Sequence, residues 1–353
     1  MQDYHAGLVW KINYLLVIIL SLTTVSIFIY LWAQDLRLRF RKRRLLKIKS
    51  NIYKLLSAEK NLTVSLDKLN LTTEQLLDVV TNRQRQLIFF NATEQEYIKN
   101  NFVNQENILK IERVACVSWN KWRRIEAILG LGYLEASSAI PIFEKNLYSK
   151  DADISYYSLL ALGQIKNSLS ARILLDFLKN NYLWRQKVAS LLESFPPDVA
   201  REVIKLTGNP DPLVRYWALK IILRFNPADF EQELIKLSCD KAGNVRAAVC
   251  ECLGSVKGEK TKAVLVESLK DDFWLVRLSA AKGLAGIQPH DWVKEVASLL
   301  NDNSLNVVEG VKDILIKNIG PALPYLEKII QGDNEMAKKI AVEIITTAKG
   351  RGL

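Results

Sequence analysis

The feature that most constrains this sequence is a repeat of 30 or 31 residues in its last two-thirds. Eight strings with the same apolar pattern begin 31, 30, 30, 31, 31, 31 and 30 residues apart. They start at Arg124, Ser155, Arg185, Arg215, Arg246, Arg277, Val308 and Lys338. A constant period without gaps indicates an array of similar supersecondary units, because such units stack on one another to bury their apolar sides.

Each string has the apolar spacing of one helical face. Its eighth residue is Leu or Ile in every unit: Leu131, Leu162, Leu192, Ile222, Leu253, Leu284, Leu315 and Ile345. Its fourth residue is small or β-branched: Ala127, Ser158, Val188, Ala218, Val249, Ala280, Val311 and Ala341. Residues four and seven apart share a side of an α-helix, so each string predicts a helix with one buried face. The small residue allows the neighbouring helix to approach closely.

A short turn and a second apolar segment follow most of the strings, and these predict a second helix in each unit. Pro141 and Pro321 lie where such a helix would begin, a position that tolerates proline. Each helix pair leaves an apolar side that only a neighbouring pair can cover. The sequence therefore predicts an all-α fold, an α-solenoid of about eight helix pairs over residues 119–353.

The strings resemble HEAT repeats, in particular the short form known from phycobilisome lyase-type proteins. The matching residues are the Val-Arg pairs at Val214-Arg215, Val245-Arg246 and Val276-Arg277, and Ala-Leu-Gly-Gln-Ile at residues 161–165. The resemblance covers about residues 120–350 and implies the fold but no activity, since the family contains scaffolds, regulators and a few enzymes. It also implies a half-buried arginine column in which each Arg hydrogen-bonds a carboxylate or carbonyl of the neighbouring turn.

Residues 12–33 contain no charged side chain. These 22 residues are enough for a helix to cross a hydrocarbon core, which takes roughly 20 residues. Aromatic residues lie at both ends (Trp10, Tyr14, Tyr30 and Trp32), as is typical of membrane interfaces. The segment is too long for the core of a signal peptide and lacks a small-x-small cleavage site. We expect a single uncleaved transmembrane helix, preceded by a short extracytoplasmic N-terminus at residues 1–11.

Eight basic residues and no acidic residue follow the span. They are Arg37, Arg39, Arg41, Lys42, Arg43, Arg44, Lys47 and Lys49, and they account for eight of the eleven net positive charges, leaving 11 − 8 = +3 for the rest of the chain. The positive-inside rule then predicts that the solenoid lies in the cytoplasm. We expect residues 34–60 to continue the helix as a basic amphipathic segment lying against anionic lipid headgroups. Alternatively, the charges only set the topology.

Residues 61–118 contain no repeat and predict a helical cap on the N-terminal end of the solenoid. One helix is expected to begin at Thr72 or Thr73, and another at Thr93, where the sequence through Glu96 fits a capping box.

The chain offers little material for catalysis or for a metal site. It has two histidines, His5 and His290, and four cysteines. Cys250 and Cys252 are two apart on an expected helix, so their side chains point in different directions and pairing them is implausible. Free buried thiols are typical of a reducing compartment. We expect no enzymatic activity, no metal and no cofactor.

The remaining functional signal is a set of aromatic and basic residues on the second face of the first helices, which we expect to line the concave surface. They are Tyr156, Tyr157, Lys187, Tyr216, Trp217, Lys220 and Lys282. Aromatic anchors with basic neighbours are common in protein interfaces. The alternative is that these large side chains fill gaps between helices.

Together these features predict a membrane-anchored adaptor or regulatory subunit that binds a protein partner through its solenoid. The resemblance to short HEAT repeats suggests a bacterial inner-membrane complex for envelope biogenesis, polymer export or signalling, with another membrane protein as partner and no nucleic acid. Two alternatives remain. One is a HEAT-type nucleic-acid-binding or base-excision protein, which would need a basic concave surface. The other is a lyase or chaperone for a tetrapyrrole chromophore, suggested by the repeat subtype.

Overall fold

The computed structural model of the chain describes residues 2–58, 72–85, 90–94, 98, 105–287 and 292–351. All regular secondary structure in these residues is helical, which confirms the predicted fold class. Contacts divide the chain into two compact units, Met1–Ile165 and Lys166–Leu353. This boundary falls inside the second repeat, between its first helix, which ends at Ile165, and its second helix, which begins at Ser168. The repeat pattern predicts no division there, and each unit is described separately.

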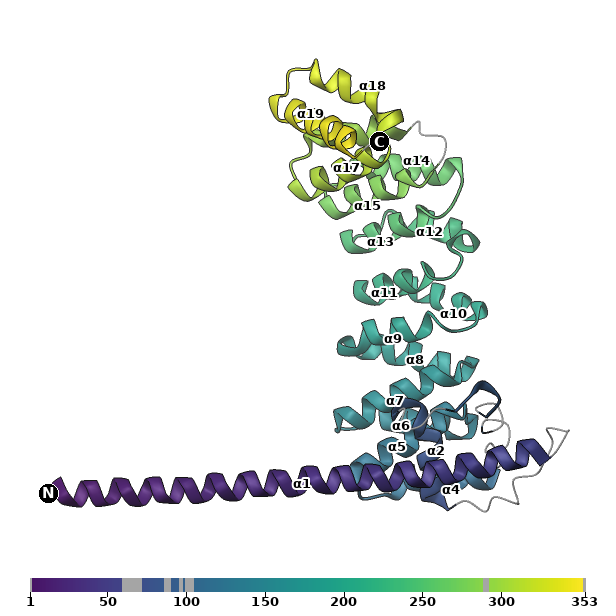
Figure 1. Cartoon of the computed structure of the whole chain (residues 1–353). Helices are drawn as coiled ribbons and strands as arrows, with labels where there is room; N and C mark the ends of the chain where they lie inside the picture. Colours follow the sequence, from purple (N-terminus) through teal and green to yellow (C-terminus); the bar gives the residue numbers. More distant parts are fainter. Residues whose placement is uncertain are drawn as a thin grey trace. The chain divides into compact units, whose positions relative to one another are not determined.

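The N-terminal unit is built around one long helix. Its described helices include α1 (Gln2–Ala58), α2 (Thr73–Arg85), α4 (Gln105–Val117), α5 (Lys121–Tyr133), α6 (Ile140–Leu147) and α7 (Ala152–Ile165). Figure 1 shows α1 as a single unbroken helix. Its second half packs into the unit through Leu45, Ile48 and Ile52, which lie on one side of the helix and are at most 3% exposed. The predicted continuation of the apolar segment as a helix is thus confirmed.

Two helices of the N-terminal unit begin with reciprocal caps. The Thr72 backbone N–H donates to the Gln75 side chain at 2.9 Å, and the Gln75 N–H donates to the Thr72 hydroxyl at 3.3 Å. The next cap joins Asn91 and Glu94, with both hydrogen bonds at 2.8 Å. The helix expected from Thr93 therefore begins two residues earlier, because the Asn91 amide oxygen accepts the backbone N–H that a cap must satisfy. Glu96 lies outside the described residues.

The C-terminal unit contains the longest run of repeats. Its α-helices are α8 (Ser168–Asn180), α9 (Arg185–Leu192), α10 (Ala200–Lys205), α11 (Pro212–Ile222), α12 (Glu231–Leu237), α13 (Gly243–Leu253), α14 (Glu259–Ser268), α15 (Trp274–Ala285), α16 (Val293–Ser298), α17 (Leu305–Lys317), α18 (Ile319–Ile330) and α19 (Glu335–Gly350). Figure 1 shows the first helices α9, α11, α13 and α15 in one row and the second helices α10, α12 and α14 in another. This arrangement is the predicted solenoid of helix pairs.

The two columns that define the repeat form the core, with one exception. All eight small or β-branched residues, from Ala127 to Ala341, are completely buried. Seven of the eight Leu or Ile residues are also completely buried, whereas Ile345 in α19 is half-buried and its neighbour Ile344 is buried instead. In α11 both Ile221 and Ile222 are buried.

The first helices of the C-terminal unit approach at backbone distance. A Cβ atom added to Gly254, at the end of α13, would lie 2.6 Å from the Cα atom of Gly283 in α15. First helices contact one another more extensively than second helices do. The first helices therefore form the more closely packed row, which is the row that carries the predicted binding residues.

Candidate functional site

The arginine column forms a ladder of ion pairs between successive repeats. Arg215 Nε and Nη2 donate to the two carboxylate oxygens of Asp240 at 2.8 and 2.7 Å, and Nη1 donates to the Asn209 carbonyl at 2.9 Å. The same paired hydrogen bonds recur from Arg246 to Asp271 and from Arg277 to Asp302. One hydrogen bond of 2.6 Å joins Arg185 to Asp211.

These partners neutralise the charge of the column. Burial alone would raise the pKa of Asp240. Hydrogen bonds from Arg215 and from the Ala242 backbone N–H, together with the charges of Arg215 and Arg246, outweigh burial and hold the pKa below its usual range. The hydrogen bond to Asp240 likewise raises the pKa of Arg215, so both groups stay charged. The column is therefore part of the framework, as the resemblance to HEAT repeats implies, and does not form a basic binding stripe.

The predicted binding residues divide between the two units. Tyr156 and Tyr157 belong to the N-terminal unit, where both are half-buried and their rings meet edge to face at 5.4 Å. Lys187 lies on α9, Tyr216, Trp217 and Lys220 on α11, and Lys282 on α15 of the C-terminal unit. The structure thus brings three of the seven residues together on one helix. We call this group, Tyr216, Trp217 and Lys220, the α11 cluster.

The α11 cluster is less exposed and less basic than the sequence suggests. Tyr216 and Trp217 are half-buried, with their rings edge to face at 5.3 Å. The Lys220 ammonium lies 2.5 Å from Glu251 of the next first helix. Burial lowers the pKa of Lys220, but the hydrogen bond to Glu251 and the negative charge of that carboxylate together outweigh burial, and the net pKa is raised. The cluster therefore presents aromatic edges beside a neutral ion pair.

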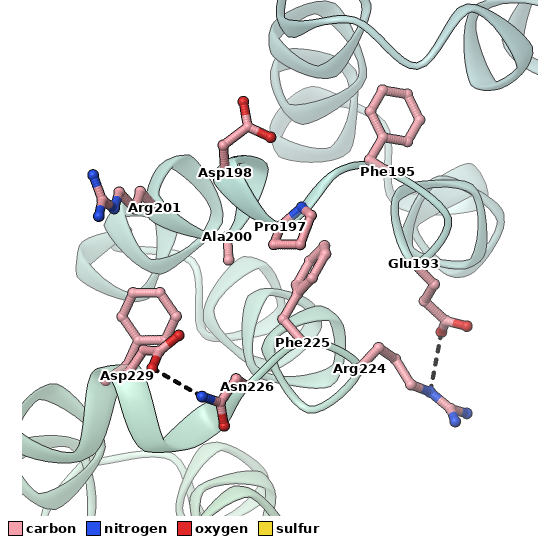
Figure 2. Close-up of a pocket in the computed structure, with 11 residues that line it drawn as sticks. Glu193, Phe195, Pro197, Asp198, Ala200, Arg201, Arg224, Phe225, Asn226 and Asp229 are labelled. Atoms are coloured by element: carbon pink, nitrogen blue, oxygen red, sulfur yellow. Dashed lines mark hydrogen bonds and ion pairs between the residues drawn. The ribbon is translucent and has the colours of Figure 1, made fainter.

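A pocket that the sequence did not reveal lies between two repeats of the C-terminal unit (Figure 2). Its volume is about 800 Å³, and it is lined by Glu193, Phe195, Pro197, Asp198, Ala200, Arg201, Arg224, Phe225, Asn226, Asp229 and Phe230. Figure 2 shows Arg224 reaching toward Glu193, at 3.6 Å, and Asn226 toward Asp229, at 2.8 Å. Phe195 and Phe230 are buried, whereas Phe225 is partly exposed. The pocket has an apolar floor and a rim of both charges.

The pocket lies at the C-terminal end of the helix that carries the α11 cluster. Arg224 and Phe225, which line the pocket, follow the last residue of α11, Ile222, by two and three residues. The cluster and the pocket are therefore both candidate binding features of the same repeat. The sequence signal for the pocket was present in the turns Pro196-Pro197 and Phe225-Asn226-Pro227, but turn residues alone do not show that two turns enclose a space.

Three of the basic residues predicted to face lipid lie against the N-terminal unit instead. Arg41 forms ion pairs with Asp78 of α2 and Glu126 of α5, and its side chain is only 12% exposed. Arg44 pairs with Asp78 at 2.8 Å, and Lys49 lies 3.5 Å from Glu94. The acidic groups of α2 and α5 hold Arg41 inside the unit, whereas the sequence predicted it at the membrane surface. Sequence alone could not place those acids opposite α1.

The ion pairs fix α1 to the rest of its unit. Burial raises the pKa of Asp78, and the charges of Arg41 and Arg44 oppose this rise. Removing either arginine would leave a buried carboxylate with less compensation. The other predicted membrane-surface residues, Arg37, Arg39, Lys42, Arg43 and Lys47, are exposed, and Arg39 also pairs with Asp35 at 2.6 Å.

The apolar part of α1 from residue 14 to residue 32 is exposed. Among the described residues, one helical stretch, Tyr14–Lys54, is long and apolar enough to cross a membrane. Its apolar window has a mean hydropathy of 2.4, and none of that window is buried by the protein.

Comparison with known proteins identifies the repeat. A family model described as HEAT repeats matches residues 200–277, which lie in the middle of the predicted array. No curated protein matches the chain.

Solved structures also resemble the chain. Kap121p bound to Pho4p is 14% identical, with 84% of this chain and 39% of that chain covered and a TM-score of 0.47. The protein YibA of Escherichia coli is 17% identical, with 73% and 99% covered and a TM-score of 0.39. Human deoxyhypusine hydroxylase in complex with glycerol is 16% identical, with 71% and 99% covered and a TM-score of 0.30.

Proposed function

We propose that this chain is a non-catalytic adaptor, anchored in a membrane by α1, which presents a HEAT-repeat solenoid to a protein partner. The observation that carries the proposal is the continuity of α1. An apolar stretch that the protein leaves uncovered runs without a break into a segment that the N-terminal unit buries and holds by ion pairs. Such a helix attaches a folded body to a bilayer without a flexible linker.

The burial pattern favours a membrane span over a core helix. A core helix of a soluble protein is mostly buried, whereas the apolar window of α1 is bare. Exposed apolar side chains over some 20 residues are stable in lipid but not in water. Since the cations follow residues 12–33 and only Lys11 precedes them, the positive-inside rule favours a cytoplasmic solenoid. We propose a bacterial inner membrane as the location, because the repeats resemble the short HEAT form that is more usual in bacteria.

The binding surface that we propose is the α11 cluster together with the pocket at the C-terminal end of α11, flanked by Lys187 and Lys282. HEAT repeats are protein-interaction scaffolds in general. Half-buried aromatic rings and an apolar pocket with a mixed-charge rim have the composition of an interface centre. Because the anchor raises the local concentration of the solenoid at the membrane, each contact can be weak and the complex still form. The partner that fits is another membrane protein or a complex assembled on one.

The nucleic-acid alternative receives no support from the charges. The arginine column is neutralised by aspartates, and Lys220 is paired with Glu251. A surface for phosphates would require cations without such partners.

The proposal is tested by capture of partners with the full-length protein in mild detergent, followed by mass spectrometry. We expect Trp217→Ala and Phe225→Ala to reduce capture of a specific membrane protein at least fivefold. Tyr182→Ala, a change at an exposed aromatic residue outside this surface, should leave it intact. Melting temperatures of all three variants separate lost binding from lost folding. Equal capture by folded Trp217→Ala, Phe225→Ala and wild-type protein would refute the proposed surface.

A further inference from the structure

The segment of α1 beyond the apolar stretch has two different sides. One side, with Arg41, Leu45, Ile48 and Ile52, packs into the N-terminal unit. The opposite side is exposed. It carries Lys42, Arg43, Leu46, Lys47, Ser50 and Tyr53. We call these six residues the outer face of α1.

The outer face combines an apolar seam with basic flanks. Leu46 and Tyr53 are 49% and 66% exposed and, with Ser50 between them, follow the i, i+4, i+7 spacing of a helix-packing seam. Lys42, Arg43 and Lys47 lie beside this seam, and residues 36–54 contain no Asp or Glu. A seam of this kind accepts a second helix, and its flanks select the charge of that helix.

Lipid headgroups lie too far away to cover most of this face. An α-helix rises about 1.5 Å per residue, so Lys47 stands about 21 Å and Tyr53 about 30 Å beyond residue 33 along α1. The headgroup layer adds about 5–8 Å to the hydrocarbon core, and charges are screened beyond about 8 Å. Arg37 and Arg39 are within reach of anionic lipid. Lys47, Ser50 and Tyr53 are not, and a straight α1 cannot lay them on the membrane surface.

A second copy of the chain is also a poor occupant. Two outer faces brought together would place basic flanks opposite basic flanks, and like charges across an interface oppose association. The charge of the face thus points to a partner of opposite charge.

We propose that the outer face of α1 binds an acidic amphipathic helix of the partner, which runs alongside α1 just above the membrane. Leu46 and Tyr53 pack against apolar residues of that helix, while Lys42, Arg43 and Lys47 pair with its glutamates or aspartates. The inference rests on the proposed membrane anchor, which sets the distance of the face from the bilayer. The outer face of α1 thus provides a second contact with the partner besides the α11 cluster, and it requires that the partner contribute an acidic amphipathic helix.

The test uses full-length protein in nanodiscs of neutral phosphatidylcholine. The probe is a fluorescent helical peptide with leucines at the a and d positions of its heptads and glutamates at e and g. A peptide with lysines at e and g is the control probe. We expect the glutamate peptide to bind at least tenfold more tightly than the lysine peptide, with an affinity that falls as salt is raised.

Three variants locate the contact. Lys42→Glu/Arg43→Glu/Lys47→Glu should weaken binding of the glutamate peptide at least tenfold, and Leu46→Ala/Tyr53→Ala at least fivefold. Lys145→Glu/Lys257→Glu/Lys260→Glu produces the same change in net charge at exposed sites elsewhere and should have less than a twofold effect. Circular dichroism and melting curves establish that all three variants are folded.

The remaining outcomes count against the inference. Equal binding of both peptides, or equal effects of the two triple reversals, would refute a specific acidic-helix site. So would binding of anionic phosphatidylglycerol nanodiscs that depends on Lys47, because it would assign the face to lipid. Carbonate extraction of the protein from membranes tests the anchor by itself. A chain that washes off the membrane refutes the proposed function, while the peptide titration still reports on the face.

Discussion

Arg215 and Asp240 share two hydrogen bonds of 2.8 and 2.7 Å and thereby join one repeat to the next. Arg215 belongs to the first helix of its repeat, and Asp240 lies in the turn that opens the following first helix. Asp240 also accepts the backbone N–H of Ala242 at 2.8 Å, so one carboxylate orders the turn and binds the neighbouring repeat. The interaction spans the joint at which a solenoid would otherwise bend.

Replacing Arg215 tests the importance of this joint. Arg215→Ala removes two charge-assisted hydrogen bonds and leaves a nearly buried carboxylate with less compensation. We expect the free energy of unfolding to fall by about 2–3 kcal/mol, measured by urea denaturation of the full-length protein in detergent. Lys205→Ala, which removes an exposed ion pair with Glu202, should cost less than about 0.5 kcal/mol. Equal losses would show that the ladder adds nothing beyond a surface pair.

The ladder also predicts the response to acid. The pKa values of Asp240, Asp271 and Asp302 are all lowered: burial raises them, but the hydrogen bonds and charge of their arginines, with a backbone hydrogen bond at each, together outweigh burial. A carboxyl group with a lowered pKa stabilises the fold above its unfolded pKa of about 3.9 and loses that contribution as pH falls through the folded value. We expect a melting temperature that changes little between pH 7 and pH 5 and declines steeply below pH 4.

Removal of ladder carboxylates provides the control for this pH dependence. Asp240→Asn/Asp302→Asn should melt at a lower temperature at pH 7, and its melting temperature should decline less on acidification than that of the wild type. Parallel pH profiles for the two proteins would assign acid sensitivity to other groups.

Two glycine substitutions should have opposite effects on stability, because α13 and α15 approach closely at Gly254 whereas Gly320 has open space around it. Gly254→Ala would place a methyl group 2.6 Å from the backbone of Gly283, so the helices must separate, at a cost of about 1–3 kcal/mol. Gly320→Ala adds a methyl group with nothing within 4 Å, at a helical position, and should stabilise the protein by about 0.5 kcal/mol. Thermal melts of both variants give the signs, and destabilisation by Gly320→Ala would contradict the open space around it.

Thiol labelling tests both packing and topology. All four cysteines are free, with Cys116 and Cys239 exposed and Cys250 and Cys252 buried. Burial raises the pKa of Cys250 to about 11 and that of Cys252 to about 12, which keeps both as unreactive thiols at neutral pH. We expect a maleimide to label two cysteines of the native protein rapidly and all four after denaturation.

The same two cysteines report on the side of the membrane. If the solenoid is cytoplasmic, a membrane-impermeant maleimide should leave Cys116 and Cys239 unlabelled in intact cells and label them after permeabilisation. A Cys116→Ser/Cys239→Ser variant, which retains only the buried thiols, gives the background. Labelling of intact cells would invert the proposed topology.

The sequence predicted those features that depend on periodicity. The repeat period identified the helices and the buried columns from Ala127 to Ala341, because the spacing of apolar residues shows directly which side of a helix is buried. The arginine partners followed from the resemblance to HEAT repeats. The exposure of Trp217 and the pairing of Lys220 with Glu251 did not follow, since both depend on the residue that occupies the adjacent repeat.

Features that depend on contacts between segments far apart in the sequence could not be predicted from the sequence alone. The eight cations after the apolar stretch look alike, yet the structure separates Arg41, which α2 and α5 enclose, from Arg43, which is exposed. The difference arises because Asp78 and Glu126 lie opposite Arg41 in the folded unit. The pocket beside α11 needed the fold as well, because its walls come from two turns about 30 residues apart.

If α1 spans a membrane as proposed, its unbroken course holds the N-terminal unit at the bilayer surface without a flexible joint. From residue 33 to Ala58 the helix extends for about 37 Å, so a 10° change in its tilt would shift the far end by about 6 Å. Bilayer thickness sets such tilts, because a helix inclines until its apolar length matches the hydrocarbon core. In a thinner membrane the whole unit would lean with the helix, and the height at which it meets a neighbour would follow the lipid composition.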